Sequence, residues 1–387
     1  MRSPGEIVSA VPFLLGFVPQ DSLVLIALRG RRLGMTCRID LADVVHDAAQ
    51  ATIIEAVQRE RATSVILAAF GPDRSDTAPA LVRMRNALLQ AGLDIREEVS
   101  VVQGRWFHET CPEARCCPAD GTPVVDHDHA PTTLALSAAM GGYLADREEV
   151  VARCSPDRPL VLAAVRSELD HLSSIPDAGA LDEDTIVADM LAVLGWADDD
   201  TASPAQLARA ATLTTAPLMR DVWYAVVAPG MMLDHRPDLC EIHERIITAG
   251  RERGELDEAG ILVDAAARAR VLGRLLQWVR SVPDDRPQFA MGPLVIAGTA
   301  HWCAGEGAYA RVLTERAQGL GTPPLSMLQT LAALIEHGLR EEHLGWLASD
   351  FAAARARARR AGGRRGRRRR GGPPRGGPHR GGPTQAA

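Results

Sequence analysis

The stretch RWFHETCPEARCCPADGTPVV, residues 105–125, separates two halves of the chain that differ in their pattern. It holds three of the seven cysteines within seven residues, beside a Trp-Phe pair and a Gly-Thr-Pro turn. Before it, short apolar runs typical of strands alternate with segments whose apolar residues have helical spacing. After it, almost every segment has helical spacing. The sequence therefore predicts an α/β domain that ends in this cysteine-rich loop, followed by an all-α half.

The sequence predicts that the α/β domain covers residues 1–130. The expected strands are Ser22–Leu28, Leu33–Leu41, Ser64–Phe70 and Asp94–Trp106, and the expected helices are Asp43–Arg61 and Ala78–Ala91. The first and third strands are continuous apolar runs, typical of strands buried on both faces. The second strand alternates and is expected to form a hairpin with the first. Two helical crossovers favour a three-layer domain with a mostly parallel sheet.

The sequence predicts that a helical domain covers residues 131–352. Its expected helices are Thr132–Val151, Leu181–Leu194, Pro204–Val227, Glu258–Val279, Phe289–Cys303, Ala308–Gln318 and Pro324–Gly338. Small residues recur in the last part, which resembles a tetratricopeptide-type hairpin. Three repeats with a fixed period of about 34 residues, which a true array needs, are missing from the sequence. We therefore expect a single helical hairpin near the end of this domain.

The charged residues are distributed unevenly. All 43 basic residues are arginine, and 12 of them lie between residues 355 and 380, where there is no acidic residue. Residues 1–352 carry the other 31 arginines and all 49 acidic residues, a net charge of −18. Such an acidic body argues against broad nucleic-acid binding by the folded part.

The tail, residues 353–387, consists mainly of Arg, Gly, Pro and Ala. Without large apolar residues it cannot bury enough surface to fold, so it is expected to be disordered. Guanidinium groups pair well with RNA or DNA phosphates, although a solvated tail without a dedicated partner fits equally. The residues expected to contact nucleic acid are Arg364, Arg365, Arg367, Arg368, Arg369 and Arg370.

Composition excludes several classes of protein. Without lysine, the chain has neither a P-loop nor a Schiff-base site. No apolar stretch reaches the roughly 18 residues that a membrane span needs. Glu6, Pro12 and Pro19 interrupt the apolar N-terminus, which therefore lacks the core of a signal peptide. We expect a cytoplasmic protein with reduced cysteines and no membrane partner.

The cysteine-rich loop gives the first candidate site. Cys111, Cys116 and Cys117, with His108, His127 or His129, offer thiolate and imidazole ligands for zinc. The spacing argues against a standard zinc site, because two of the cysteines are adjacent and there is no second close pair. A disulfide or a reactive thiolate among these cysteines is a second interpretation. The third is structural, with the cysteines packed as small apolar residues under Trp106.

The ends of the strands give the second candidate site. Ligands of open α/β sheets collect at the carboxyl ends of strands. Asp40, Asp73 and Arg74 lie near such ends, and we expect them to line a ligand-binding crevice beside the cysteine-rich loop. The sequence Gly305–Gly307 imitates a dinucleotide-binding fingerprint, but no strand precedes it. His301 lies in a helical segment and is expected to be structural or exposed.

Several segments of the chain resemble one known family. They are VPFLLGFVPQDSLVLIAL at 11–28, RIDL at 38–41, the loop at 105–124, ADREEVVAR at 145–153 and WCAGEGAYARVLTERA at 302–317. Together they are similar to the actinobacterial family called domain of unknown function 4192, over roughly residues 3–350. The Cys-Cys-Pro near Gly-Thr-Pro is the most specific part. That family has no assigned activity, so the resemblance implies no catalytic residues.

Three functions fit these patterns. The first is a non-enzymatic binding or regulatory protein whose helical half contacts a protein partner, which the helical hairpin and the lack of catalytic motifs favour. The second is an enzyme, or a metal- or thiol-dependent protein, with its site between the α/β domain and the cysteine-rich loop. The third is association with RNA or DNA through the basic tail. The patterns point to no substrate, partner identity or oligomeric state.

Overall fold

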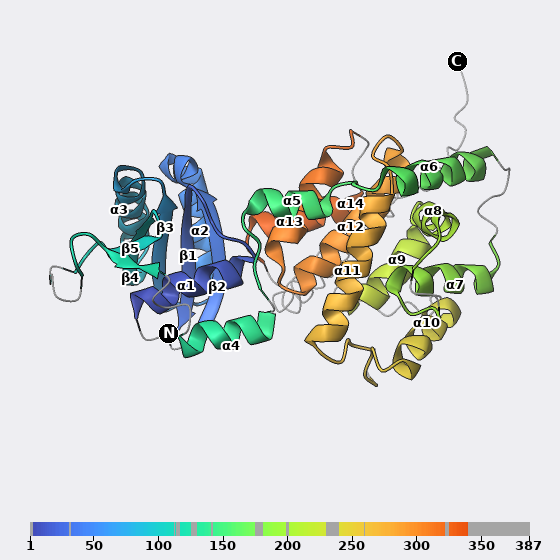
Figure 1. Ribbon diagram of the computed structural model, residues 1–387, viewed down its shortest axis with the longest axis horizontal. Helices are drawn as coiled ribbons and strands as arrows, with labels where there is room; N and C mark the ends of the chain where they lie inside the picture. The colour runs from blue at the N-terminus through green and yellow to red at the C-terminus, as the bar shows by residue number, and fades with distance from the viewer. Residues whose placement is uncertain are drawn as a thin grey trace, which may run out of the picture. The chain divides into compact units, whose positions relative to one another are not determined.

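The computed structural model (Figure 1) describes residues 3–30, 32–111, 113, 117–124, 130–140, 142–174, 181–198, 201–229, 240–258, 260–321 and 325–339. All of them lie in one compact unit, Met1–Glu341. Cys116, His127, His129 and the arginine-rich tail lie outside the described residues, so the expectation of a disordered tail stays a prediction.

The N-terminal half is built on a six-stranded sheet with the order β2-β1-β3-β4-β5-β6. The strands are β1 (Ser22–Arg29), β2 (Arg32–Asp40), β3 (Ser64–Gly71), β4 (Asp94–Val102), β5 (Arg105–His108) and β6 (Thr122–Pro123). The expected hairpin of β1 and β2 is confirmed, because the two strands pair antiparallel. The expectation of a mostly parallel sheet is wrong. In the described part of the chain, β3 and β4 are the one parallel pair of neighbours, and the sheet is mixed and mostly antiparallel.

The prediction of a mostly parallel sheet fails because of the position that β3 takes in the strand order. β2 and β3 do run in the same direction, as a helical crossover between them predicts. β3, however, lies beside β1 and not beside β2, so β1 pairs antiparallel with both. A crossover that passes over one strand therefore gives antiparallel neighbours.

The expected single strand Asp94–Trp106 is also wrong, because the chain reverses within it. Gln103 and Gly104 both have positive φ, 50° and 72°. Two such residues form the tight turn that suits a β-hairpin. β4 and β5 accordingly pair antiparallel on either side of the turn.

Helices cover both faces of the sheet, so the three-layer expectation is confirmed (Figure 1). A 3-10 turn, η1 (Leu41–Val45), leads into α2 (Asp47–Arg59), which packs on one face together with α3 (Arg74–Gln90). α1 (Pro4–Leu15) packs on the other face. Successive residues of β1 and β3 enter the two cores alternately, which is why these strands are apolar throughout.

α1 was not among the expected helices, although the sequence carries its start and stop signals. The Ser3 hydroxyl accepts a hydrogen bond from the Glu6 backbone N–H (3.3 Å), and Pro4 occupies the first turn. Gly16, with φ of 83°, ends the helix. Pro12 lies inside the helix and obscures the pattern, because proline lacks the N–H of a helix interior.

The C-terminal half is helical in the described residues, as expected. Its helices are α4 (Pro131–Met140), α5 (Arg147–Cys154), α6 (Pro159–Ser174), α7 (Glu183–Leu194), α8 (Pro204–Leu213), α9 (Pro217–Val227), α10 (Cys240–Glu252), α11 (Ala265–Ser281), α12 (Pro287–Cys303), α13 (Gly307–Gln318) and α14 (Ser326–Glu336). Two expected helices are divided: Thr132–Val151 into α4 and α5, and Pro204–Val227 into α8 and α9. Pro217 starts α9, because the first turn needs no N–H from it.

An apolar core holds these helices together. Trp223 of α9 and Trp278 of α11 are fully buried, and their rings stack with centroids 4.8 Å apart. The Trp278 Nε1–H donates to the Leu207 carbonyl oxygen of α8 (3.2 Å), so the indole also satisfies its polar atom. α12 and α13 pack against each other, and Gly298 allows Leu313 to approach α12 closely.

Candidate functional site

The residues expected to line a crevice share one end of the sheet. Asp40, at the end of β2, pairs with Ser22 of β1, which pairs in turn with Phe70 of β3. Asp73 and Arg74 follow β3 directly. Because β2 and β3 run in the same direction, their carboxyl ends meet at this edge.

Both aspartates at this edge take part in local structure. Asp40 forms an ion pair with Arg38 of its own strand. Asp73 caps α3, its Oδ1 accepting a hydrogen bond from the Ser75 backbone N–H (2.8 Å). That hydrogen bond lowers the pKa of the Asp73 carboxyl. Ligand binding by these carboxylates remains a prediction, since local hydrogen bonds account for their positions.

Arg74 belongs to a polar seam between α3 and the sheet that the sequence did not reveal. Its guanidinium pairs with Glu109 (2.9 Å) and lies 4.8 Å from the centre of the Phe107 ring. Further along α3, Arg85 forms an ion pair of 3.2 Å with Glu98, and the Glu98 side chain is 2% exposed. The two guanidinium groups neutralise carboxylates that α3 covers, which supports a structural role for this seam.

The cysteine-rich loop is described only in part. Cys111 and Cys117 are half-buried, whereas Cys116 lies outside the described residues. The Nε2 of His108 is 2.9 Å from a Glu97 oxygen, and its Nδ1 accepts from a backbone N–H two residues later (3.3 Å). Both ring nitrogens of this expected zinc ligand therefore already have partners.

Metal binding by the loop is left as a prediction. Where the structure describes the chain, no three His, Cys, Asp or Glu side chains are grouped so that they could hold a metal ion. Without Cys116 this finding decides neither the zinc site nor a disulfide. Trp106 is part of the core between the sheet and α1, and its covering of the cysteines stays a prediction.

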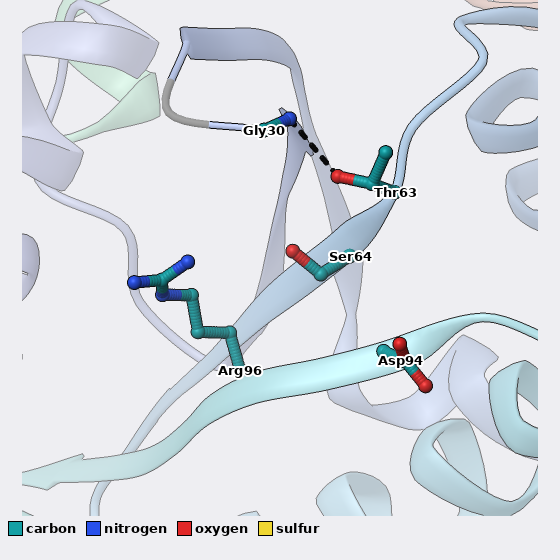
Figure 2. Close-up of a pocket in the computed structure, with 5 residues that line it drawn as sticks. All are labelled: Gly30, Thr63, Ser64, Asp94 and Arg96. Carbon is teal, nitrogen blue, oxygen red and sulfur yellow. Dashed lines mark hydrogen bonds between the residues drawn. The ribbon is translucent and has the colours of Figure 1, made fainter.

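A hollow of about 490 Å³ lies at the opposite end of β3 and β4. It is lined by Gly30, Thr63, Ser64, Asp94 and Arg96. Figure 2 shows the Gly30 backbone N–H donating to Thr63 Oγ1, a hydrogen bond of 2.9 Å. The Ser64 hydroxyl and the Arg96 side chain extend into the same space, whereas the Asp94 carboxylate points away from Arg96. The sequence did not predict this site, because it arises where the end of β1 meets the starts of β3 and β4.

The family comparison covers both halves of the structure. The model of one family, described as Domain of unknown function (DUF4192), matches residues 4–342. The chain belongs to the DUF4192 family. The DUF4192 match includes the sheet and every helix from α1 to α14, and its description gives no activity. Comparisons with curated proteins and with solved structures gave no match. No helix in the described part of this DUF4192 chain is long and apolar enough to cross a membrane.

Three segments that suggested the DUF4192 resemblance come together in the structure. The Leu144 backbone N–H donates to the Gly16 carbonyl oxygen (2.9 Å), and the Val18 N–H donates to the Leu144 carbonyl oxygen (3.0 Å). Just after this contact, Arg147 of α5 pairs with Glu315 of α13 (2.8 Å). The opening segment is therefore bonded to Leu144, directly before the ADREEVVAR segment, and that segment is bonded to the final motif.

His301 of this DUF4192 chain lies near the same junction, at the end of α12. Its side chain is 1% exposed, and its Nδ1 is 2.6 Å from a Glu306 oxygen. The ring stacks on Tyr309 of α13 with centroids 5.0 Å apart. Burial raises the pKa of Tyr309, and Arg153 of α5 opposes this rise through its positive charge and a hydrogen bond. The His301 Nε2 is buried with no hydrogen-bond partner among the described residues. With so little exposure, this group supports helix packing better than it supports acid-base chemistry on a substrate.

Proposed function

We propose that the protein is a non-enzymatic binding protein that holds an amphipathic helix of a partner protein against α4. One observation supports this proposal above the others. The ten residues of α4, PTTLALSAAM, include no charged side chain, yet the helix has an exposed apolar face. Leu134 is 53% exposed, and Ala135 and Ala138 beside it are also exposed.

The opposite face of α4 is fixed to the α/β half. α4 packs against α1, and the Thr132 hydroxyl donates to a Glu6 carboxylate oxygen of α1 (3.1 Å). Thr133 is buried beside it. Just beyond α4, Tyr143 is 45% exposed and meets the Phe13 ring edge-on, with centroids 4.8 Å apart. α4 therefore presents its outer face from a fixed position, with an aromatic side chain nearby.

The chemistry of this face favours a helix as the partner. Ala135 and Ala138 are small and allow another helix to approach closely. Leu134 can pack into a groove on the surface of the partner helix. A partner charge placed against this uncharged face would lose water without gaining a counter-ion. The contacting face of the partner helix is therefore apolar, with Leu134 and Tyr143 as the anchoring side chains.

Replacing Leu134 by a photo-crosslinking residue in the full chain is expected to trap one discrete partner in the host cell. The same replacement at Val82, which is 43% exposed on α3, serves as the control and is expected to trap none. The purified partner should then bind Leu134→Glu at least about tenfold more weakly than it binds the original chain or Val82→Glu, because a charge replaces an anchor. Affinity measured by isothermal titration calorimetry checks this.

Two results would overturn the α4 proposal. The first is a partner that binds Leu134→Glu as tightly as the unchanged chain. The second is an adduct in which residue 134 is joined to another copy of this chain, which would make α4 a self-association surface. A stable fold of Leu134→Glu, checked by circular dichroism, keeps the comparison valid.

A second function, association with nucleic acid, is supported by the sequence of the tail. Twelve arginines lie between residues 355 and 380 without an acidic residue, whereas the body carries a net charge of −18. Arginine pairs bidentately with phosphate, and contacts made in this way weaken steeply as salt rises. The tail, and not the acidic body, is therefore the proposed contact for RNA or DNA.

Replacing the six arginines of one cluster by glutamine in the full chain is expected to weaken single-stranded RNA binding at least about tenfold at 0.15 M salt. The slope of log affinity against log salt should fall at the same time, because fewer counterions are released. Fluorescence anisotropy at several salt concentrations measures both quantities. Unchanged affinity and slope would remove the tail from this role. The cluster is Arg364, Arg365, Arg367, Arg368, Arg369 and Arg370.

A further inference from the structure

We propose that the hollow at the end of β1, β3 and β4 is a binding site for the phosphate group of a small molecule. Arg96 and Ser64 supply the hydrogen-bond donors for the phosphate. This site is separate from α4 and does not depend on the function proposed for that helix.

A β-bulge directs Arg96 into the hollow. Val65 of β3 pairs with Ile95 of β4, but the next residue, Ile66, pairs with Glu97. Arg96 is therefore an extra residue that has no opposite partner in the ladder. A bulge of this kind changes the direction of a side chain that would otherwise follow the alternation of the strand.

The donors in the hollow differ in whether they are already engaged. The Thr63 hydroxyl donates to the Leu28 carbonyl oxygen (3.1 Å) and accepts from the Gly30 N–H, so it fixes the wall. Neither the Arg96 guanidinium nor the Ser64 hydroxyl forms a hydrogen bond or ion pair with any residue in the described ranges. Figure 2 shows both extending into the same space. An anion placed there would displace water from the exposed Arg96, but it would not have to displace another described residue from either donor.

The charge around the hollow favours an anion. Arg29 and Arg32 face each other across the β1–β2 pair, and the Arg29 side chain is 46% exposed. Arg61 is exposed two residues before Thr63. Glu60, buried within 3.7 Å of Arg29, and Asp94, which lines the hollow, offset only part of this charge. This end of the sheet is thus locally basic on a body that is acidic as a whole.

Size and chemistry narrow the ligand to a phosphorylated small molecule. A volume of about 490 Å³ falls within the range of small-molecule sites, roughly 300–1,000 Å³. A guanidinium binds two phosphate oxygens at once, and the Ser64 hydroxyl can donate to a third. Asp94 also lines the hollow and can accept hydrogen bonds from hydroxyl groups of the ligand. A sugar phosphate or polyol phosphate combines these features better than a bare ion does.

The test uses the full chain and a signal from the site itself, because the tail arginines also attract phosphate. Amide resonances of Gly30, Ser64 and Arg96 are followed in nitrogen-15 TROSY spectra during titration. The probes are inorganic phosphate, glycerol 3-phosphate and acetate. We expect saturable shifts with both phosphates, tighter binding of glycerol 3-phosphate, and no comparable shift with acetate.

Variants connect these shifts to the proposed donors. Arg96→Gln is expected to weaken phosphate binding at least about tenfold, and Ser64→Ala to weaken it less, because a charged donor contributes more than a neutral one. Arg83→Gln, an exposed arginine on α3, is the matched control and should bind as the unchanged chain does. Absence of shifts at these amides, equal binding by Arg96→Gln, or equal binding of acetate would each overturn the proposal. Melting curves confirm that the variants are folded.

Discussion

Replacing Arg209 by methionine is expected to lower the free energy of unfolding by about 3–5 kcal/mol at pH 7. Arg209 of α8 donates two hydrogen bonds, each 2.7 Å long, to the carboxylate of Asp189 on α7. The Asp189 side chain is 1% exposed, so the substitution leaves a buried charge without its counter-ion. The remaining carboxylate keeps its desolvation penalty but loses the interaction that offset it.

The loss caused by Arg209→Met should shrink in acid. Burial raises the pKa of Asp189 in the folded protein, and Arg209 opposes that rise. Without Arg209, the folded pKa moves further above the unfolded value of about 3.9. The loss is then full at neutral pH, shrinks as the pH falls through the folded pKa, and disappears below the unfolded pKa.

Urea denaturation at pH 7 and at pH 4.5 measures this effect, with Arg245→Met as the matched control. Arg245 pairs with Asp184, whose side chain is 87% exposed. Losing such a surface pair costs about 1 kcal/mol or less. A similar loss in both variants, or a loss for Arg209→Met that does not decrease between the two pH values, would contradict a role for the buried pair.

Replacing Gly292 by alanine is expected to destabilise the protein by about 1–3 kcal/mol or more, although alanine normally stabilises a helix. Gly292 lies in α12, and an added Cβ would overlap the Oγ1 and Cβ atoms of Thr214. Thr214 is 1% exposed and its hydroxyl donates to the Ala211 carbonyl oxygen (2.7 Å), so it cannot easily move away. The clash therefore outweighs the gain in helix propensity.

Gly273→Ala in α11 is expected to have the opposite effect, because no atom of the described residues lies within 4 Å of an added Cβ there. That variant should gain about 0.5–1 kcal/mol from helix propensity alone. Combining Gly292→Ala with Thr214→Gly should restore part of the stability, which a double-mutant cycle measures. If Gly292→Ala melts at the same temperature as the unchanged chain, α8 and α12 are not packed as closely as described.

The strands were predictable because their signal is local. The expected Ser22–Leu28 and Ser64–Phe70 agree with β1 and β3 to within one residue. The order of strands was not predictable in the same way, because insertion of β3 beside β1 depends on contacts between distant residues. The turn at Gln103 and Gly104 was missed since apolar alternation continues on both sides of it.

The candidate sites show the same limit. Asp73 and Arg74 were correctly located just after a strand, but sequence alone does not distinguish a helix cap from a ligand contact. Arg96 looks like any charged residue of an alternating strand, and only the pairing of β4 with β3 shows that it is an extra residue. The pairing of His301 with Glu306 could have been predicted from the sequence, because the two residues are five positions apart across a glycine turn.

The contact between Phe17 and Leu144 has a consequence for how the chain could be assembled. Backbone hydrogen bonds join the residues around Phe17 to Leu144, and α4 packs on α1, so segments on either side of the β6–α4 connection already hold each other without it. We therefore expect a piece ending at β6 and a piece beginning at α4 to reassociate when they are mixed, because each supplies backbone partners that the other lacks.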